Sequence, residues 1–168
     1  HLGSDGVLVH AQTVGPEKVE GEIEVHITSK GDNSCTLNVD ITSPRGERVF
    51  SKRQKARLDG KPVSVAFSVD NPTLWSLRDP ALYTVTASIG EDSNTDRVAV
   101  RTGFRSIGAS TAEGLTINGE RTPVRGVTLY HDNALSGGTL TPEDYDADLR
   151  IIRTMGANRT DWTSCRRS

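Results

Sequence analysis

Acidic side chains gather in the last third of the chain, where they could donate and accept protons. Asp132 is followed by Glu143, Asp144 and Asp146. General acid–base catalysis needs two such groups held at one reacting bond. Thr141, however, is a good helix N-cap, so the last three carboxylates fall in the first turns of a helix, where negative charge complements the helix dipole. We therefore predict no catalytic residue among them.

Other chemistries lack their characteristic residues. The sequence contains no glycine-rich phosphate loop, no Gly-x-Ser-x-Gly elbow and no His/Cys ligand set. The two cysteines, Cys35 and Cys165, have no spacing that suggests a metal site or a disulfide framework. Cys35 lies at an apolar position of an expected strand and is predicted to be a small buried hydrophobe. We expect no cofactor and no metal.

Charge and hydropathy exclude two further partners. The formal net charge is −2, which provides no strong field for nucleic acid or an anionic membrane surface. The basic run Lys52–Arg57 has no interleaved aromatics and is expected to be a solvated strand edge. No apolar run approaches the roughly 20 residues that cross a bilayer. The first residues show no signal peptide pattern, which favours a cytoplasmic location.

The first hundred residues predict a β-sandwich, because apolar residues recur at every second position in four segments. Short strands of this kind, separated by turn signals such as Ser43-Pro44-Arg45-Gly46, are typical of two packed antiparallel sheets. Weaker alternation at 7–13, 48–54 and 96–100 raises the expected number of strands to about seven. The alternating apolar residues are Ile23, Val25 and Ile27; Leu37, Val39 and Ile41; Val63, Val65, Phe67 and Val69; and Tyr83, Val85, Ala87 and Ile89.

The connection from Asn71 to Tyr83 contains two prolines, which do not fit a regular sheet. Trp75 in this connection is expected to cover one end of the sandwich as a structural plug. A sugar-stacking role for its indole is the alternative. Tyr83 opens the next strand, where its hydroxyl is placed to bond back to the chain as a corner tyrosine.

Residues 115–158 follow a different pattern. Asn118-Gly119 suits the positive φ angles of a tight two-residue hairpin turn. A short strand at Val124–Leu129 is followed by a helix with Thr141 as N-cap and Gly156 at its end. The apolar stripe of that helix comprises Tyr145, Leu149, Ile152 and Met155. Strand, loop and helix make one β/α unit.

Four short segments occur in a fixed order: Gly103-Phe104-Arg105, Leu115–Glu120, Val124–Val127 and Met155–Asn158. With the connection around Trp75, this order resembles glycoside hydrolase family 2, the group of β-galactosidases, β-glucuronidases and β-mannosidases. The resemblance implies an immunoglobulin-like sandwich over residues 1–103 and the start of a catalytic (β/α)8 barrel, or TIM barrel, over residues 104–168. The expected fold class is mainly β: an antiparallel β-sandwich, then a β-hairpin and one β/α unit of an incomplete barrel.

The catalytic machinery that the resemblance implies lies outside this sequence. A (β/α)8 barrel takes about 250 residues, whereas 65 residues follow Gly103. In family 2 both catalytic groups are glutamates on later barrel strands, the first within an Asn-Glu pair, and this chain contains no Asn-Glu dipeptide. We expect a non-catalytic segment of a retaining β-glycosidase, inactive by itself, that scaffolds the barrel. Its expected partners are the rest of that glycosidase and, in the parent enzyme, a terminal β-galactoside or related β-glycoside.

The resemblance also implies a substrate-binding site. In a parallel barrel the chemistry lies on loops that follow the carboxyl ends of the strands, which places Tyr130, His131 and Asp132 on the substrate face. Family 2 typically has a sugar-lining histidine where Tyr130 stands, followed by the His-Asp that is present here. Tyr130 can still donate a hydrogen bond but is not a cation near neutral pH. For His131 three interpretations stay open: a sugar contact, a structural histidine and a metal ligand.

Residues 159–168 depart from the family pattern. The usual Ser-His and Pro are missing, and the segment lacks the apolar alternation that a buried second barrel strand needs. We therefore expect this tail to be a truncation or reading-frame artefact and not native barrel. The alternative function is a free-standing β-sandwich module that binds carbohydrate or protein, with a helical C-terminal extension, and a well-packed second layer built from residues 104–158 would favour it.

Overall fold

The computed structural model describes residues 2–28, 34–90, 96–130 and 141–163. The chain divides into two compact units. The first comprises His1–Ile107 with Ile117–Gly119, and the second comprises Gly108–Thr116 and Glu120–Ser168. Within the described part of the chain, no helix has the length and apolar character needed to cross a membrane.

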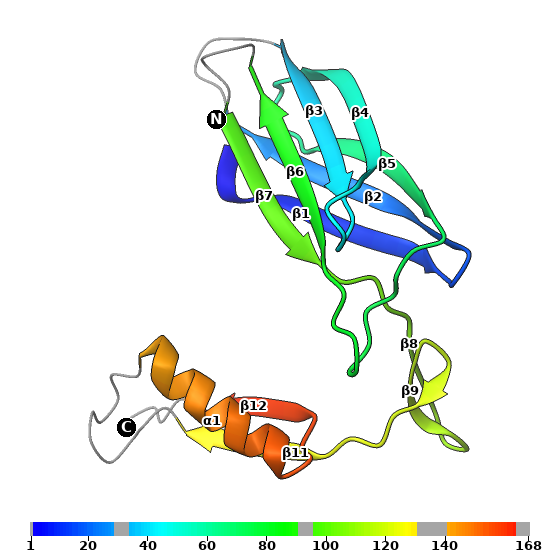
Figure 1. Cartoon of the computed structure of the whole chain (residues 1–168). Coiled ribbons are helices and arrows are strands. Elements are labelled where there is room, and N and C mark those ends of the chain that lie inside the picture. The colour runs from blue at the N-terminus through cyan, green and yellow to red at the C-terminus, as the bar shows by residue number, and fades with distance from the viewer. Residues whose placement is uncertain (1, 29–33, 91–95, 131–140, 164–168) are drawn as a thin grey trace. The chain divides into compact units, whose positions relative to one another are not determined.

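The first unit is a sandwich of two antiparallel sheets (Figure 1). One sheet has the order β1-β2-β5 and the other the order β4-β3-β6-β7. The predicted immunoglobulin-like sandwich is confirmed, including strands at the three weakly alternating segments. The strands are β1 (Leu2–Val14), β2 (Lys18–Ile27), β3 (Ser34–Thr42), β4 (Arg48–Arg57), β5 (Val63–Asp70), β6 (Tyr83–Ile89) and β7 (Asp96–Thr102).

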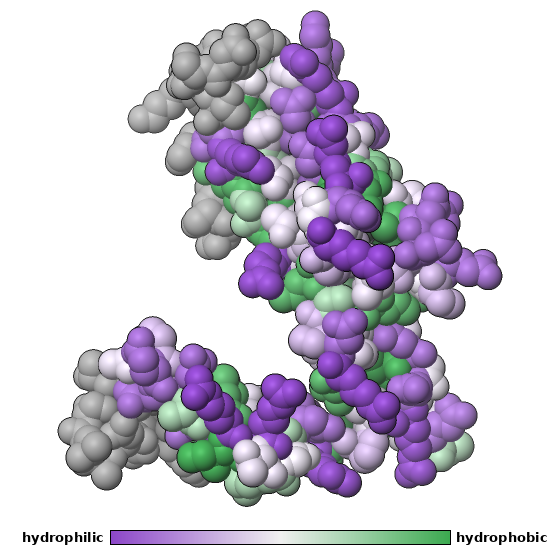
Figure 2. Space-filling view, in the orientation of Figure 1, coloured by the Kyte–Doolittle hydropathy of each residue, from purple (hydrophilic) through white to green (hydrophobic). Residues whose placement is uncertain are grey.

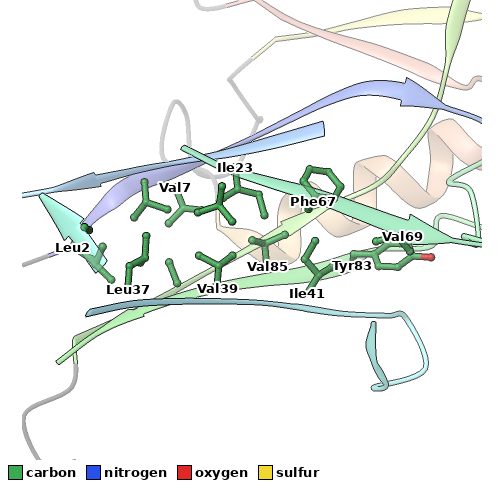
Figure 3. Packing of buried hydrophobic residues seen from close by; sticks show 14 of the residues in the cluster. Leu2, Val7, Ile23, Leu37, Val39, Ile41, Phe67, Val69, Tyr83 and Val85 are labelled. Atoms are coloured by element: carbon green, nitrogen blue, oxygen red, sulfur yellow. The ribbon is translucent and has the colours of Figure 1, made fainter. Parts of the chain in front are cut away.

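The core lies between these sheets, because every second side chain along each strand points inward (Figure 3). Register keeps apolar partners on one face: Val39 lies opposite Ala87, and Ile41 lies opposite Val85. Burying each such aliphatic side chain stabilises the fold by about 1.5–3 kcal/mol. Cys35 packs against this core, as predicted for a small hydrophobe, but it is partly and not fully buried.

A small three-stranded sheet with the order β10-β9-β8 follows the sandwich. It comprises β8 (Ile107–Ser110), β9 (Gly114–Ile117) and β10 (Glu120–Arg121). Asn118 and Gly119 join β9 to β10 with φ angles of 53° and 80°. These positive values are the ones that a tight hairpin turn demands, and the predicted Asn-Gly hairpin is confirmed.

The C-terminal part forms a β/α/β unit of β11 (Gly126–Tyr130), α1 (Pro142–Thr154) and β12 (Arg159–Thr163). Thr141 caps the helix through a capping box with Asp144, and Gly156 ends it with φ 78°. Both predicted helix boundaries are therefore confirmed.

The first part of the tail forms a strand even though it lacks the apolar alternation expected of a buried barrel strand. Residues 159–163 form β12, which pairs in parallel with β11, while the proposal that the tail is a truncation or reading-frame artefact stays a prediction. The strand does not depend on apolar alternation, because Arg159 and Asp161 are exposed and form an ion pair at 3.2 Å. Its register is set by backbone hydrogen bonding instead. Residues 164–168 lie outside the described residues.

Phe104 is placed differently from its predicted domain. The sequence assigns it to the second domain, whereas its ring is 1% exposed and belongs to the core of the sandwich. Its centroid lies 4.8 Å from that of Tyr83 and 5.8 Å from that of Phe67. The sandwich thus extends past Gly103.

Candidate functional site

The predicted substrate face lies where two parallel strands end. β11 and β12 pair from Gly126 opposite Arg159 to Tyr130 opposite Thr163. Both strands therefore finish at the same edge, and the segments that follow them leave from that edge. In (β/α) folds this carboxyl edge is where ligands bind.

Tyr130 is the last residue of β11, so its backbone lies at this edge. His131 and Asp132 come next in the sequence and lie outside the described residues, as does the side chain of Tyr130. The position of the predicted site along the fold is thus set by β11, while the contacts of its three side chains stay a prediction.

Asn158 fastens the opposite ends of the two strands. Its side-chain Oδ1 accepts a hydrogen bond from the Arg125 backbone N–H at 2.9 Å, and its Nδ2 donates to the Pro123 carbonyl at 2.8 Å. Its own backbone N–H donates to the Arg125 carbonyl, also at 2.9 Å. One residue before β12 therefore holds the segment that leads into β11, and this contact fixes the register of the pair. Asn158 was part of a family motif in the sequence, but its positioning role was not predicted.

The acidic cluster serves the helix in the way that the sequence predicted. The Asp144 carboxylate accepts a hydrogen bond from the Thr141 backbone N–H at 2.9 Å, and the Asp144 N–H donates to the Thr141 hydroxyl at 3.4 Å. Glu143 also lies in the first turn of α1. Carboxylates at these positions complement the positive end of the helix dipole. Their arrangement accounts for the concentration of charge in the first turn of α1, while the expectation that no member of the cluster is catalytic stays a prediction.

The Trp75 connection closes one end of the sandwich. The Trp75 backbone N–H donates to the Phe104 carbonyl at 2.8 Å, and the Arg105 guanidinium lies 4.7 Å from the centre of the indole ring. A Cβ added to Gly103 would lie 2.8 Å from Trp75 Cδ1, so only glycine allows this approach. The ring is thus packed against its own chain, which favours the structural plug over sugar stacking. The corner-tyrosine prediction is confirmed, because the Tyr83 hydroxyl accepts from the Thr73 N–H at 2.8 Å.

Asn118 locks this end of the sandwich in the same manner as Asn158 locks the strand pair. Its Nδ2 donates to the Trp75 carbonyl at 3.0 Å, and its Oδ1 accepts from the Ser106 N–H at 3.0 Å. The Asn-Gly dipeptide signalled the turn in the sequence, whereas these two side-chain contacts to distant residues left no local pattern.

Comparisons with known proteins point in one direction. The sequence pattern that defines glycosyl hydrolases family 2 matches residues 8–105, which is more than half of the chain. The chain is 26% identical over 164 residues to beta-galactosidase BoGH2A of Bacteroides ovatus, covering 94% of this chain and 19% of that protein. It is 27% identical over 162 residues to a beta-glucuronidase of Bacteroides fragilis, covering 92% of this chain and 23% of that protein.

Solved structures show the same similarity. A putative beta-galactosidase from Bacteroides fragilis superposes with a TM-score of 0.88 at 26% sequence identity, covering 98% of this chain and 26% of that one. The match includes the sandwich and the β/α/β unit, because it spans nearly the whole chain. The chain corresponds to about a fifth of the length of the two curated relatives described above.

Proposed function

The chain belongs to family 2 of the glycosyl hydrolases, and from this premise we propose that it is a non-catalytic segment of a retaining β-glycosidase. In that role the sandwich scaffolds the catalytic barrel, and the β11–α1–β12 unit opens the barrel. The parent enzyme hydrolyses terminal β-galactosides or related β-glycosides. Two carboxylates about 5–5.5 Å apart are required for retention, and the proposal assigns both to later strands of the barrel.

The β11–α1–β12 unit carries this proposal. A parallel β/α/β unit is the repeating element of a (β/α)8 barrel. Its helix exposes large apolar side chains: Leu149 is 42% exposed, Ile151 61% and Met155 69%. A helix with such a face is stable in water only when other elements cover it. The remaining strands and helices of the barrel are the proposed cover.

Tyr130, His131 and Asp132 are the proposed sugar contacts. They follow β11 at the edge where a barrel binds its substrate. A phenol and a carboxylate supply a donor and an acceptor for sugar hydroxyls, and the imidazole supplies either according to its protonation. These groups bind and orient the sugar in the proposal and take no part in bond cleavage.

The alternative of a free-standing module gains no support from this arrangement. Such a module would bury the apolar face of α1 within its own chain, whereas Ile152 is the one buried apolar residue of α1 and its neighbours in the described residues. The glycosidase segment is therefore the function that the fold supports best.

An activity assay tests the proposal directly. The purified 168-residue chain is incubated with p-nitrophenyl β-galactoside and β-glucuronide, and a complete family 2 β-galactosidase serves as the positive control. We expect no turnover above buffer. Turnover that disappears in the Asp132→Asn variant would contradict the non-catalytic role. Sequencing the gene beyond codon 168 provides the second readout, in which an Asn-Glu pair within a continuing barrel is expected and an unrelated domain would refute the assignment.

A further inference from the structure

The outer face of the β4-β3-β6-β7 sheet concentrates positive charge. Register places outward residues of β4 and β7 on the same face as Asn38 of β3 and Ser88 of β6. Asp40 is the one carboxylate among the outward strand residues described for this sheet, and Arg48 lies 3.9 Å from it. The cationic side chains on this basic face are Arg48, Arg53, Lys55, Arg57, Arg97 and Arg101.

The basic face has two charged borders and a neutral centre. β4 and β7 are the outer strands of the sheet, about 14 Å apart for three strand spacings. The two strands between them present partly exposed hydroxyls and an amide, including Thr84, Ser88 and Asn38. Strongly hydrophilic residues likewise border paler ones over the sandwich in Figure 2. A linear ligand that crosses the sheet would therefore meet cations at both ends and hydrogen-bonding groups between them.

Protection of exposed strand edges does not account for this charge. Edge strands carry charged side chains, lysine above all, that discourage pairing with other chains, whereas five of the six cations on the basic face are arginines. The other sheet also has two edges, β1 and β5, and the outward residues of β5 include no cation. The accumulation of one sign on one sheet thus needs another explanation.

The opposite face of the sandwich is acidic. Glu20, Glu22 and Glu24 of β2 point outward with Asp70 of β5, and Lys18 is the one Lys or Arg among the described outward residues of these two strands. The Lys18 ammonium lies 2.6 Å from the Glu20 carboxylate, and this hydrogen-bonded carboxylate raises the pKa of Lys18. A second copy could match its acidic face to the basic face only by head-to-tail stacking, and because the two faces lie on opposite sides of the sandwich, such stacking would extend into an open filament and not close into a ring. A copy of this chain is therefore a poor occupant.

We propose that the basic face binds a carboxylate-bearing polysaccharide, a polyuronate. Arginine supplies most of its cations, and the planar guanidinium forks match carboxylates with paired hydrogen bonds. The central hydroxyl and amide groups suit the sugar hydroxyls between successive carboxylates. Single-stranded nucleic acid fits less well, because its binding surfaces stack bases on aromatic side chains. The described outward positions of these four strands carry none.

Binding of polygalacturonate to the 168-residue chain tests this proposal, with neutral dextran, dextran sulfate and a single-stranded DNA oligonucleotide as comparison ligands. Isothermal titration calorimetry is run at low and at physiological ionic strength. We expect polygalacturonate to bind at low ionic strength. Its affinity should fall as the salt concentration rises, because salt screens charge-driven association. The triple variant Lys55→Gln/Arg97→Gln/Arg101→Gln removes charge from both borders and should weaken binding at least about tenfold. Dextran should not bind.

A matched triple variant controls for net charge. Arg45→Gln/Lys61→Gln/Arg78→Gln removes three exposed cations that lie in loops and turns. Its affinity should stay within about twofold of the unsubstituted chain. Equal losses in both triples would show a net-charge effect and overturn the proposal. Tighter binding of DNA or dextran sulfate than of polygalacturonate would overturn the assignment to a polyuronate, and no binding at low ionic strength would overturn it altogether.

Amide chemical shifts of the unsubstituted chain give a readout that needs no variant. Addition of polygalacturonate should shift the amides of Asn38, Thr86 and Ala99, which lie on three adjacent strands of the basic face. Glu22, on the acidic face, should stay unmoved. The opposite pattern would place the ligand elsewhere. Because no residue of the second unit is involved, these outcomes are independent of the assay of glycosidase activity.

Discussion

In the sandwich, apolar side chains of two sheets meet in one continuous buried cluster, whereas the β11–α1–β12 unit buries little apolar surface of its own. The sandwich strands find all their apolar partners within the first hundred or so residues. The helix of the second unit has a comparable apolar content but leaves Leu149, Ile151 and Met155 exposed. The difference lies in whether the packing partners belong to the same stretch of chain.

The two units consequently rely on different forces. Burial of aliphatic and aromatic groups holds the sandwich, and each large core residue contributes a sizeable share of a total stability of about 5–15 kcal/mol. In the second unit, hydrogen bonds do most of the ordering: the Asn158 clamp, the strand ladder and the cap at Thr141. Such contacts are worth about 0.5–1.5 kcal/mol each. Substitutions should therefore be most damaging in the sandwich core.

Replacing the buried ring at the end of the sandwich should have the largest effect. Phe104→Ala removes a ring that is 1% exposed and packs on Tyr83 and Phe67. We expect the free energy of unfolding of the sandwich to fall by about 3–5 kcal/mol. The matched change Ile151→Ala, at a side chain that is 61% exposed, should alter stability by less than about 0.5 kcal/mol. Urea unfolding measures both, and equal losses would mean that α1 is as well packed as the core.

Substitutions of Asn118 and Asn158 compare the side-chain hydrogen bonds of the two units. Asn118→Gly keeps the positive φ of the turn but removes both side-chain bonds, which are partly buried. We expect a loss of about 1–3 kcal/mol for the sandwich. Asn158→Ala also removes two side-chain bonds, but these are exposed and water replaces them in part. A loss of about 0.5–1.5 kcal/mol is expected there.

Hydrogen exchange distinguishes the two asparagine effects by location. Asn118→Gly should speed exchange of the Trp75 and Ser106 amides, while Asn158→Ala should speed exchange along β11 and β12. Asn158→Asp is the control that retains the acceptor and removes the donor, so it should fall between the alanine variant and the unsubstituted chain. If Asn158→Ala lowered the free energy of unfolding more than Asn118→Gly did, burial of the hydrogen bonds would not determine the size of the two effects.

The sequence predicted the sandwich more completely than the second unit. The sandwich was predicted strand by strand, because the alternation of apolar and polar residues predicts the burial of side chains such as Ile23, Val39 and Val85. Turn and cap residues such as Asn118 and Thr141 also act locally, and their predictions are confirmed. Features that depend on distant residues were not predicted.

Two such features show why. β12 lacks apolar alternation, and its place beside β11 depends on contacts between Asn158 and residues more than thirty positions earlier. The basic face joins Lys55 to Arg97 and Arg101 through the registers of three strand pairs. The run Lys52–Arg57 is visible in the sequence as a basic segment. Arg97 and Arg101 come to the same surface only through the order of the strands in the sheet. The side chains of the predicted sugar site follow β11 and remain the untested part.

A local effect similar in size to that of Asn158→Ala is expected at the N-terminus of α1, where a single cap orders the start of the helix. Thr141→Ala removes the hydroxyl that accepts from the Asp144 N–H and should cost about 1 kcal/mol of local stability. Thr141→Ser keeps that acceptor and should recover most of the loss. Thr154→Ala, at the other end, removes a hydroxyl that donates only to the Arg150 carbonyl, so it should change stability very little. Exchange rates of the α1 amides measure all three. If Thr141→Ala left those rates unchanged while Ile151→Ala raised them, apolar packing and not capping would order the helix, and the contrast drawn between the two units would fail.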